Sequence, residues 1–522
     1  MNLHRVLRAA PALLAAALII LTTFAVAQEN LAEEQVLRVG LNASDIGTLD
    51  PHATLLLPDS PIKYAIFEGL LQYNEPGNVA SGVAPGLAER WESSEDGAVW
   101  TFHLSPDVQW HRDNGMLSAQ DVVYSFERAL DPERSSVLAS PVWQRIESVE
   151  AIDDMTVQVT LSTADPLYDI KLASQRDGQV IVPQAAVEGM GDDEFAANPI
   201  GSGPFMFESY SSQDEVVLVA NDEYYEGEPV LERIEFKYVP SLSARNLALQ
   251  QGELHMAFGN SDPLWIEDMR SSGITVDLLG PGFTGLLMFN LNREPVDNHL
   301  VRQAIAHAIN REALSALMAG PPQISPLPED GWLFATNEGV PAYEYDLERS
   351  QELLAEAGYP DGVSLGEQVT SESSYYRPQL EAVQSMLADA NIELDLSVVD
   401  HATFHQLQGE DANALPLFGG GGFDGLSVLT QFFHEDGGLN FSHYTGVSDL
   451  LDQAAATADV DEIERIMAEV QRKLLEDLAV YPTVTVMKVL ARQPYVDLGY
   501  EAVATMTDFY ALTEETAILQ PE

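Results

Sequence analysis

The sequence contains no cysteine among its 522 residues. That absence excludes disulfide bonds, zinc sites built on thiolates and a cysteine nucleophile. It also excludes attachment to a membrane through a lipidated cysteine. We therefore expect a chain that is neither cross-linked nor lipid-anchored.

Basic residues are scarce. The sequence has 25 lysines and arginines against 82 acids, a formal net charge of −57. The lysines are Lys63, Lys171, Lys237, Lys473 and Lys488. Such a charge repels other polyanions, so we exclude nucleic acid and anionic membrane as partners. The acids are spread along the whole chain, which favours halophilic adaptation, that is, a surface suited to a saline medium, over an acidic cleft or calcium storage.

Long apolar runs are absent except near the N-terminus. Met1 to Arg8 is basic, Ala12 to Phe24 is apolar, and Ala25 to Ala27 offers small residues at a cleavage point. This order predicts a secretory signal peptide over residues 1–27. The alternative is a membrane anchor, but the run is shorter than the ~20 residues that a spanning helix needs. We expect export and a soluble mature chain from Gln28.

Motifs of catalysis are also missing. The sequence has no G-x-S-x-G elbow, H-E-x-x-H helix or P-loop, and no internal repeat. We expect no catalytic residue, no metal and no cofactor; the rival interpretation is a secreted hydrolase with paired carboxylates. Gly420 to Gly425 matches G-x-G-x-x-G, but no βαβ unit accompanies it. His401 and His405 have a metal-compatible spacing, yet a solvated helix face is favoured.

The length of the chain predicts two or three domains. The interleaved helical and strand patterns predict an α/β or α+β protein with several sheets. Alternation predicts strands over residues 37–41, 99–104 and 156–161. Apolar spacing predicts helices over 302–317, 347–357 and 461–479, and Ser118 to Asp121 predicts a capping box that opens another. Leu279 to Gly285 and the strand Tyr481 to Val486 are candidate crossings between lobes, although a plain loop is an equal alternative for the first.

A set of segments resembles one known family, the extracellular solute-binding proteins of family 5, which serve dipeptide, oligopeptide and nickel ABC importers. They occur in the family's order over nearly the whole mature chain. The segments are Thr48–His52, Val83–Glu92, Ser94–Gly97, Trp100–Leu104, Leu117–Phe126, Asn198–Phe205, Phe289–Asn290, Val301–Ile305, Ala355–Gly362, Asn440–Tyr444 and Asp449–Leu451.

The resemblance implies an α/β fold of two lobes, the periplasmic-binding-protein fold, with a linking domain on the first lobe. The implied divisions are 1–27 signal peptide, 28–70 first lobe, 71–198 linking domain, 199–283 first lobe, 284–485 second lobe and 486–522 return to the first lobe. It further implies a periplasmic monomer that is not an enzyme. Such a protein captures a ligand between its lobes and delivers it to the permease subunits of an ABC transporter.

The resemblance also locates a ligand site in the second lobe. Family members that bind peptides grip the ligand's ammonium with an aspartate, whose position here falls at Gly421, and its carboxylate with an arginine, whose position falls at Thr370. The expected ligand-binding residues are Phe418, Gly420, Gly421, Gly422, Phe423, Asp424, Thr370, Tyr375, Tyr376 and Arg377. The family favours a peptide or peptide-like ligand. The displaced charges favour a bulkier or less charged one, such as an oligosaccharide or an opine, because an unpaired buried charge is costly.

Overall fold

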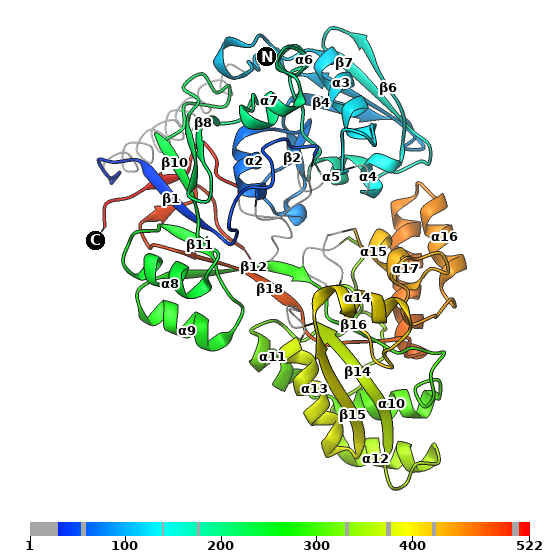
Figure 1. Cartoon of the computed structure of the whole chain (residues 1–522). Coiled ribbons are helices and arrows are strands. Elements are labelled where there is room, and N and C mark those ends of the chain that lie inside the picture. Colours follow the sequence, from blue (N-terminus) through cyan, green and yellow to red (C-terminus); the bar gives the residue numbers. More distant parts are fainter. Residues whose placement is uncertain are drawn as a thin grey trace, which may run out of the picture.

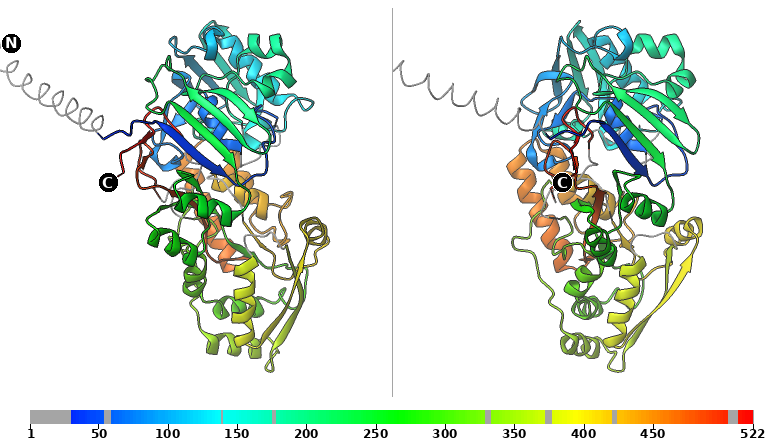
Figure 2. Two further views of the ribbon diagram at one scale, coloured as in Figure 1. Left: turned by 60° about the vertical axis from the view of Figure 1, so that its left-hand side comes forward. Right: turned by 90° about the vertical axis from the view of Figure 1, so that its left-hand side faces the viewer.

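The computed structural model describes residues 30–53, 59–137, 140–174, 178–328, 333–371, 377–419, 424–503 and 511–521. Figure 1 shows two lobes, with the segments drawn blue to green above and those drawn yellow to orange below. Strands β12 and β18 lie at the junction of the two lobes. The turned views of Figure 2 place the yellow strands at the end of the molecule far from the cyan ones.

Lobe I is built on a seven-stranded sheet in the order β12-β18-β11-β1-β10-β9-β8. Its strands are β1 (Val36–Leu41), β8 (Phe205–Ser211), β9 (Glu215–Ala220), β10 (Arg233–Tyr238), β11 (Met256–Phe258), β12 (Thr275–Phe283) and β18 (Val486–Arg492). β1 runs parallel to β10 and β11, and the other neighbours are antiparallel. Helices α8 (Leu242–Gln250) and α9 (Pro263–Ser271) bury Leu249, Trp265 and Met269 against it.

The linking domain contains an antiparallel sheet in the order β4-β5-β7-β6. Its strands are β4 (Ala88–Ser93), β5 (Val99–Leu104), β6 (Ile146–Asp153) and β7 (Thr156–Leu161). Its helices are α3 (Ala119–Leu130), α4 (Pro141–Gln144), α5 (Tyr168–Leu172), α6 (Gln184–Met190) and α7 (Asp192–Ala197). The predicted capping box is confirmed, because the side chains of Ser118 and Asp121 each accept from the other's backbone N–H. Helix α2 (Ser60–Ile66) and the pair β2 (Leu71–Tyr73) and β3 (Val83–Pro85) connect the linking domain to lobe I.

A buried ion pair ties the linking domain to the start of the chain. Arg128, on α3, donates to both carboxylate oxygens of Asp50, and the distance from its Nη1 to Oδ1 is 2.8 Å. Its Nη2 also reaches Asp192 at 3.1 Å. The Arg128 side chain is 1% exposed, so this two-pronged contact fixes the linking domain on lobe I.

Lobe II contains an antiparallel sheet in the order β16-β13-β17 and a parallel pair β14-β15. Its strands are β13 (Leu286–Met288), β14 (Val363–Ser371), β15 (Ile392–Val399), β16 (Leu417–Phe418) and β17 (Val480–Pro482). Its helices are α10 (His299–Ala308), α11 (Arg311–Met318), α12 (Leu347–Glu356), α13 (Arg377–Asp389), α14 (His401–Gly409), α15 (Gly425–Phe433), α16 (Ser448–Ala456) and α17 (Val460–Glu476). Two apolar cores lie on either side of β13.

The chain ends beside its described start. Strands β19 (Val496–Asp497) and β20 (Ala517–Ile518) pair with each other. The backbone N–H of Ile518 donates to the side chain of Gln35 at 3.0 Å, and the Gln35 amide donates back to the Ile518 carbonyl at 2.8 Å. The C-terminal segment thereby returns to lobe I.

Two details of the sequence prediction were wrong. The helix predicted over 302–317 is two helices, because Ile309 is extended and the Asn310 side chain caps α11 by accepting from the N–H of Ala313 at 3.0 Å. The strand predicted from Tyr481 to Val486 is also interrupted, since β17 ends at Pro482 and β18 starts at Val486. Residues between them carry the chain from one sheet to the other.

Candidate functional site

The two lobes are joined by the two predicted crossings. The chain leaves the seven-stranded sheet at the end of β12, enters the lobe II sheet at β13, and returns from β17 to β18. The N–H of Thr483 donates to the Gly285 carbonyl at 2.8 Å, so the two crossings are bonded to each other. Any change in the angle between the lobes passes through these strands.

Buried amide side chains hold the crossings in register. Gln379, at 0% exposure, donates to the Thr483 hydroxyl at 2.6 Å, and that hydroxyl donates to the Gly285 carbonyl at 3.0 Å. The Gln323 side chain accepts from the Gly285 N–H at 3.1 Å. A Cβ on Gly285 would lie 2.2 Å from the Val484 carbonyl oxygen. Glycine is required there for close approach of two backbones.

Phe418 ends strand β16 and is half-buried. Its ring stacks on Phe404, with centroids 6.3 Å apart, and tilts against Phe441 at 5.3 Å. β16 is held by β13, where Leu286 pairs with Phe418. The apolar part of the predicted site is therefore an aromatic group set on the lobe II sheet. Gly420, Gly421, Gly422 and Phe423 lie outside the described residues.

Asp424 is the N-cap of α15. Its side chain accepts from the N–H of Leu426 at 3.2 Å and from the Ser427 hydroxyl. Its Oδ2 also lies 3.0 Å from the Nζ of Lys171, which belongs to α5 of the linking domain. Asp424 of lobe II thus forms an ion pair with a lysine of the linking domain.

Lys171 and Asp424 lie in a shielded group of four charges. The Lys171 Nζ is 2.8 Å from Asp165, and Arg145 is 3.1 Å from the same carboxylate. Burial alone would raise the pKa of Asp424, but Lys171, the Ser427 hydroxyl and Arg145 together outweigh burial and hold that pKa below its usual range. Burial alone would lower the pKa of Lys171, and the carboxylates of Asp424 and Asp165 raise it instead. Both groups therefore carry their charge at neutral pH.

The other predicted segment lies beside β16. Thr370, on β14, is 4% exposed. Two residues earlier, the Gln368 amide donates to the Leu415 carbonyl at 3.0 Å, so the end of β14 is pinned to the chain that enters β16. The structure thus brings the Thr370 and Phe418 segments together.

Arg377 starts α13 and pairs with Glu381 on the same helix at 2.8 Å. Such a half-exposed pair is weak, and it already occupies the guanidinium. Tyr375 and Tyr376 lie outside the described residues. Within the described residues of this segment, therefore, no arginine without an acidic partner is present to bind a ligand carboxylate.

The sequence patterns did not identify Lys171 and Asp165 as site residues. They also did not identify Gln379 and Gln323, whose side-chain amides hold the two crossings in register. The one available indication was that Lys171 is among five lysines of a very acidic chain. Nothing in the local pattern indicates that it meets Asp424, because that contact joins segments far apart in the chain.

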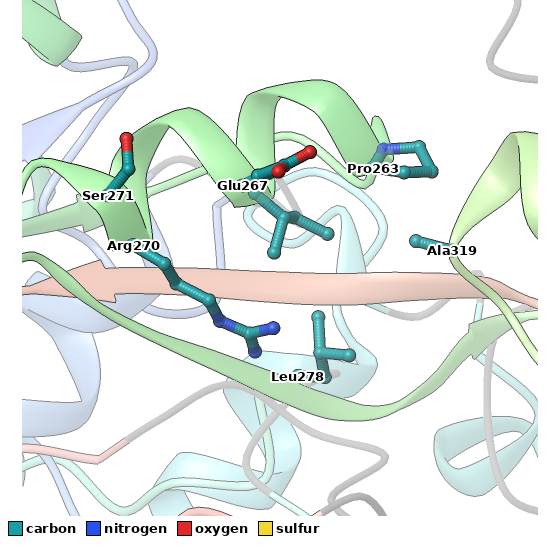
Figure 3. A pocket seen from close by; sticks show the side chains of 7 residues that line it. Pro263, Glu267, Arg270, Ser271, Leu278 and Ala319 are labelled. Atoms are coloured by element: carbon teal, nitrogen blue, oxygen red, sulfur yellow. The ribbon is translucent and has the colours of Figure 1, made fainter.

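Two cavities lie away from these residues. One, of about 560 Å³, is lined by residues of α9, by Leu278 of β12 and by Ala319 at the end of α11 (Figure 3). Arg270 and Glu267 are its charged lining residues. The other, also about 560 Å³, lies between α13 and β15 in lobe II. Neither contains a predicted site residue.

Within the described part of the chain, no helix has the length and apolar character to cross a bilayer. The same residues contain no group of three or more histidine, aspartate or glutamate side chains arranged to hold a metal ion. The side chains of His401 and His405 lie outside what the structure describes.

Comparison with known proteins gives a consistent result. Residues 82–440 match the family described as bacterial extracellular solute-binding proteins, family 5 (middle region). The dipeptide-binding protein of Escherichia coli is 28% identical over 412 residues, 72% of this chain and 76% of that protein. Heme-binding protein A of Haemophilus influenzae is 30% identical over 315 residues, 54% of this chain and 55% of that protein.

Solved structures extend the similarity to nearly the whole chain. The binding protein MoaA of A. tumefaciens R10, solved in complex with mannopinic acid, is 31% identical and has a TM-score of 0.75. The match covers 93% of this chain and 99% of that one. The two-lobed α/β architecture predicted from the sequence is thereby confirmed.

Proposed function

The chain belongs to the bacterial extracellular solute-binding proteins of family 5, the ligand-capturing components of ABC importers, and from this premise we propose a site and a ligand class. The site lies between lobe II and lobe I, with Phe418 to Phe423 and Thr370 to Arg377 facing the ligand. Asp424 closes one edge of it. The ligand is not an ordinary zwitterionic dipeptide.

The observation that carries the proposal is the pairing of the charged groups at the predicted site. A dipeptide in a shielded site needs an anion for its ammonium and a cation for its carboxylate, since an unpaired buried charge is costly. Asp424 is paired with Lys171, and Arg377 is paired with Glu381. Thr370 and Gly421 offer no charge. What remains at Phe418 is an aromatic face, which suits a bulkier or less charged molecule.

The relatives supply the panel for a test. One is named for dipeptides, one for heme, and MoaA was solved with mannopinic acid, so these three ligand classes are the first to measure. The protein is unfolded and refolded to remove any bound molecule, then titrated by calorimetry with a dipeptide library, mannopinic acid and heme. We expect no dipeptide to bind at micromolar or lower Kd. A single micromolar dipeptide would overturn the proposal.

We further propose that the protein works in the periplasm as a monomer. Its signal peptide, residues 1–27, is cleaved off during export, and the mature chain is not lipidated. The absence of cysteine supports the last point. The ligand-bound form is delivered to permease subunits. N-terminal sequencing of the exported protein tests the cleavage after Ala27, and an uncleaved N-terminus would contradict it.

A further inference from the structure

Within the described residues, an ion pair joins the linking domain directly to lobe II. Lys171, on α5, has its Nζ 3.0 Å from Oδ2 of Asp424, the N-cap of α15. Figure 1 shows α4 and α5 at the edge of the linking domain that faces α15. The contact therefore lies where the two lobes meet, on the side away from the β12 and β18 crossing.

The pair is shielded and electrically balanced only while the lobes touch. The exposed fractions of the Lys171 and Asp424 side chains are 8% and 12%, and that of Asp165 is 4%. Together with Arg145, the group holds two cations and two carboxylates. When the lobes separate, the linking domain keeps one excess positive charge and lobe II keeps the Asp424 carboxylate. Opposite charges then face each other across the opening, and their attraction grows as the lobes approach and water is excluded from between them.

The lobe II side of the contact is firmly held. Asp424 forms a parallel β-bridge with Leu333, and the Leu333 side chain packs against the core that lobe I shares with the linking domain. A Cβ on the next residue, Gly425, would lie 2.5 Å from the Leu333 carbonyl oxygen. The carboxylate is thus presented by packed backbone, with an apolar contact between the lobes beside it.

We propose that Lys171 and Asp424 form a latch that stabilises the closed arrangement of the lobes and positions lobe II on the linking domain. The latch acts without any charge from the ligand. Because apparent affinity depends on the fraction of protein in the binding-competent arrangement, a preformed contact of this kind tightens the capture of an uncharged ligand. This inference requires only that the lobes separate, whichever ligand they bind.

The test measures the radius of gyration of ligand-free protein by small-angle X-ray scattering. Lys171→Met removes the cation at similar length, and Asp424→Asn removes the carboxylate charge while keeping an equally good N-cap. We expect both variants to expand, with the open-to-closed ratio rising about tenfold, equivalent to about 1.4 kcal/mol. The double variant should expand no more than either single one, because the same contact is lost.

The two substitutions change net charge in opposite directions, which separates a latch from general repulsion. General repulsion predicts that Lys171→Met expands the protein and Asp424→Asn compacts it. Lys237→Met is the matched cation control, since Lys237 pairs with Glu215 at 2.6 Å within the lobe I sheet. Asp459→Asn is the matched cap control, since Asp459 caps α17 by accepting from Glu462 N–H at 3.2 Å. Both controls should keep the wild-type radius.

Three results would overturn the latch. They are an unchanged radius in both variants, changes of opposite sign that follow net charge, and additive expansion in the double variant. If Lys171→Met does not fold, comparison of Asp424→Asn with its control Asp459→Asn still tests the latch. Ligand binding by the calorimetric panel is a separate readout, so failure of the latch and failure of the proposed ligand class can be told apart.

Discussion

Replacement of Gly285 by alanine should damage the junction between the lobes. The added Cβ would lie 2.2 Å from the Val484 carbonyl oxygen and 2.6 Å from the Thr483 hydroxyl. Real Cβ atoms do not approach backbone oxygen so closely, so the first crossing must move away from the second.

The cost has two parts. Forcing a methyl group into packed backbone costs about 1–3 kcal/mol. The displacement also weakens three hydrogen bonds at Gly285, two from Thr483 and one to Gln323, each of which contributes roughly 0.5–1.5 kcal/mol. Because the backbone relaxes, the steric cost and the hydrogen-bond losses are not felt in full. We expect the free energy of unfolding to fall by about 3 kcal/mol.

Urea unfolding followed by tryptophan fluorescence measures this loss. Gly438→Ala is the control, because a Cβ there meets nothing within 4 Å, and its stability should stay within about 0.5 kcal/mol of wild type. If Gly285→Ala were as stable as Gly438→Ala, the close approach of the two crossings would not be a determinant of the fold, and the reasoning from the junction geometry would be refuted.

Three other perturbations test the acidic surface, the glycine run and a buried carboxyl group. The melting temperature should rise between 0.1 and 2 M KCl, because the Debye length shrinks to about 3 Å at 1 M and relieves the repulsion from the net charge of −57; a flat or falling Tm would contradict halophilic adaptation. Gly421→Leu should weaken ligand binding at least about tenfold, or about 1.4 kcal/mol, with little change in the Tm of the ligand-free protein; normal binding would place the site elsewhere, and unfolding would assign the glycines to packing. Burial raises the pKa of Glu68 from 4.5 to about 7, despite hydrogen bonds at 2.9 Å from the Tyr224 and Tyr225 hydroxyls. A raised carboxyl pKa gives stability that is full below about pH 4.5 and is lost as the pH rises to about 7, so the stability of Glu68→Gln relative to wild type should increase by up to about 3 kcal/mol over that window and then level off. A difference that does not vary with pH would show that Glu68 titrates normally.

The sequence predicted those elements whose cause is local. The alternation of Val99 to Leu104 and of Thr156 to Leu161 buries one face of each strand, and both are strands of the linking domain. The helix from Leu347 ends where Gly358 takes a φ of +97°. The break at Asn310 was missed because the apolar spacing continues across it, and a single capping side chain outweighs that pattern.

The site was only partly accessible to sequence reasoning. The resemblance assigned Phe418 and Thr370 to one ligand site, and that assignment stays a prediction. The structure shows that their segments are linked, because the Gln368 amide donates to the Leu415 carbonyl. The partner of Asp424 could not be predicted, because Lys171 meets it only through the arrangement of the two lobes. Likewise, Gln379 gives no local indication that it bonds to Thr483 across the junction.

The most direct test of ligand capture between two lobes is small-angle X-ray scattering of refolded, ligand-free protein before and after addition of a low-molecular-mass extract of the source culture. Native mass spectrometry of the same sample establishes that one small molecule is bound. The account predicts that the radius of gyration falls when the adduct forms, because the ligand holds the lobes together. A bound adduct with an unchanged or larger radius would contradict it.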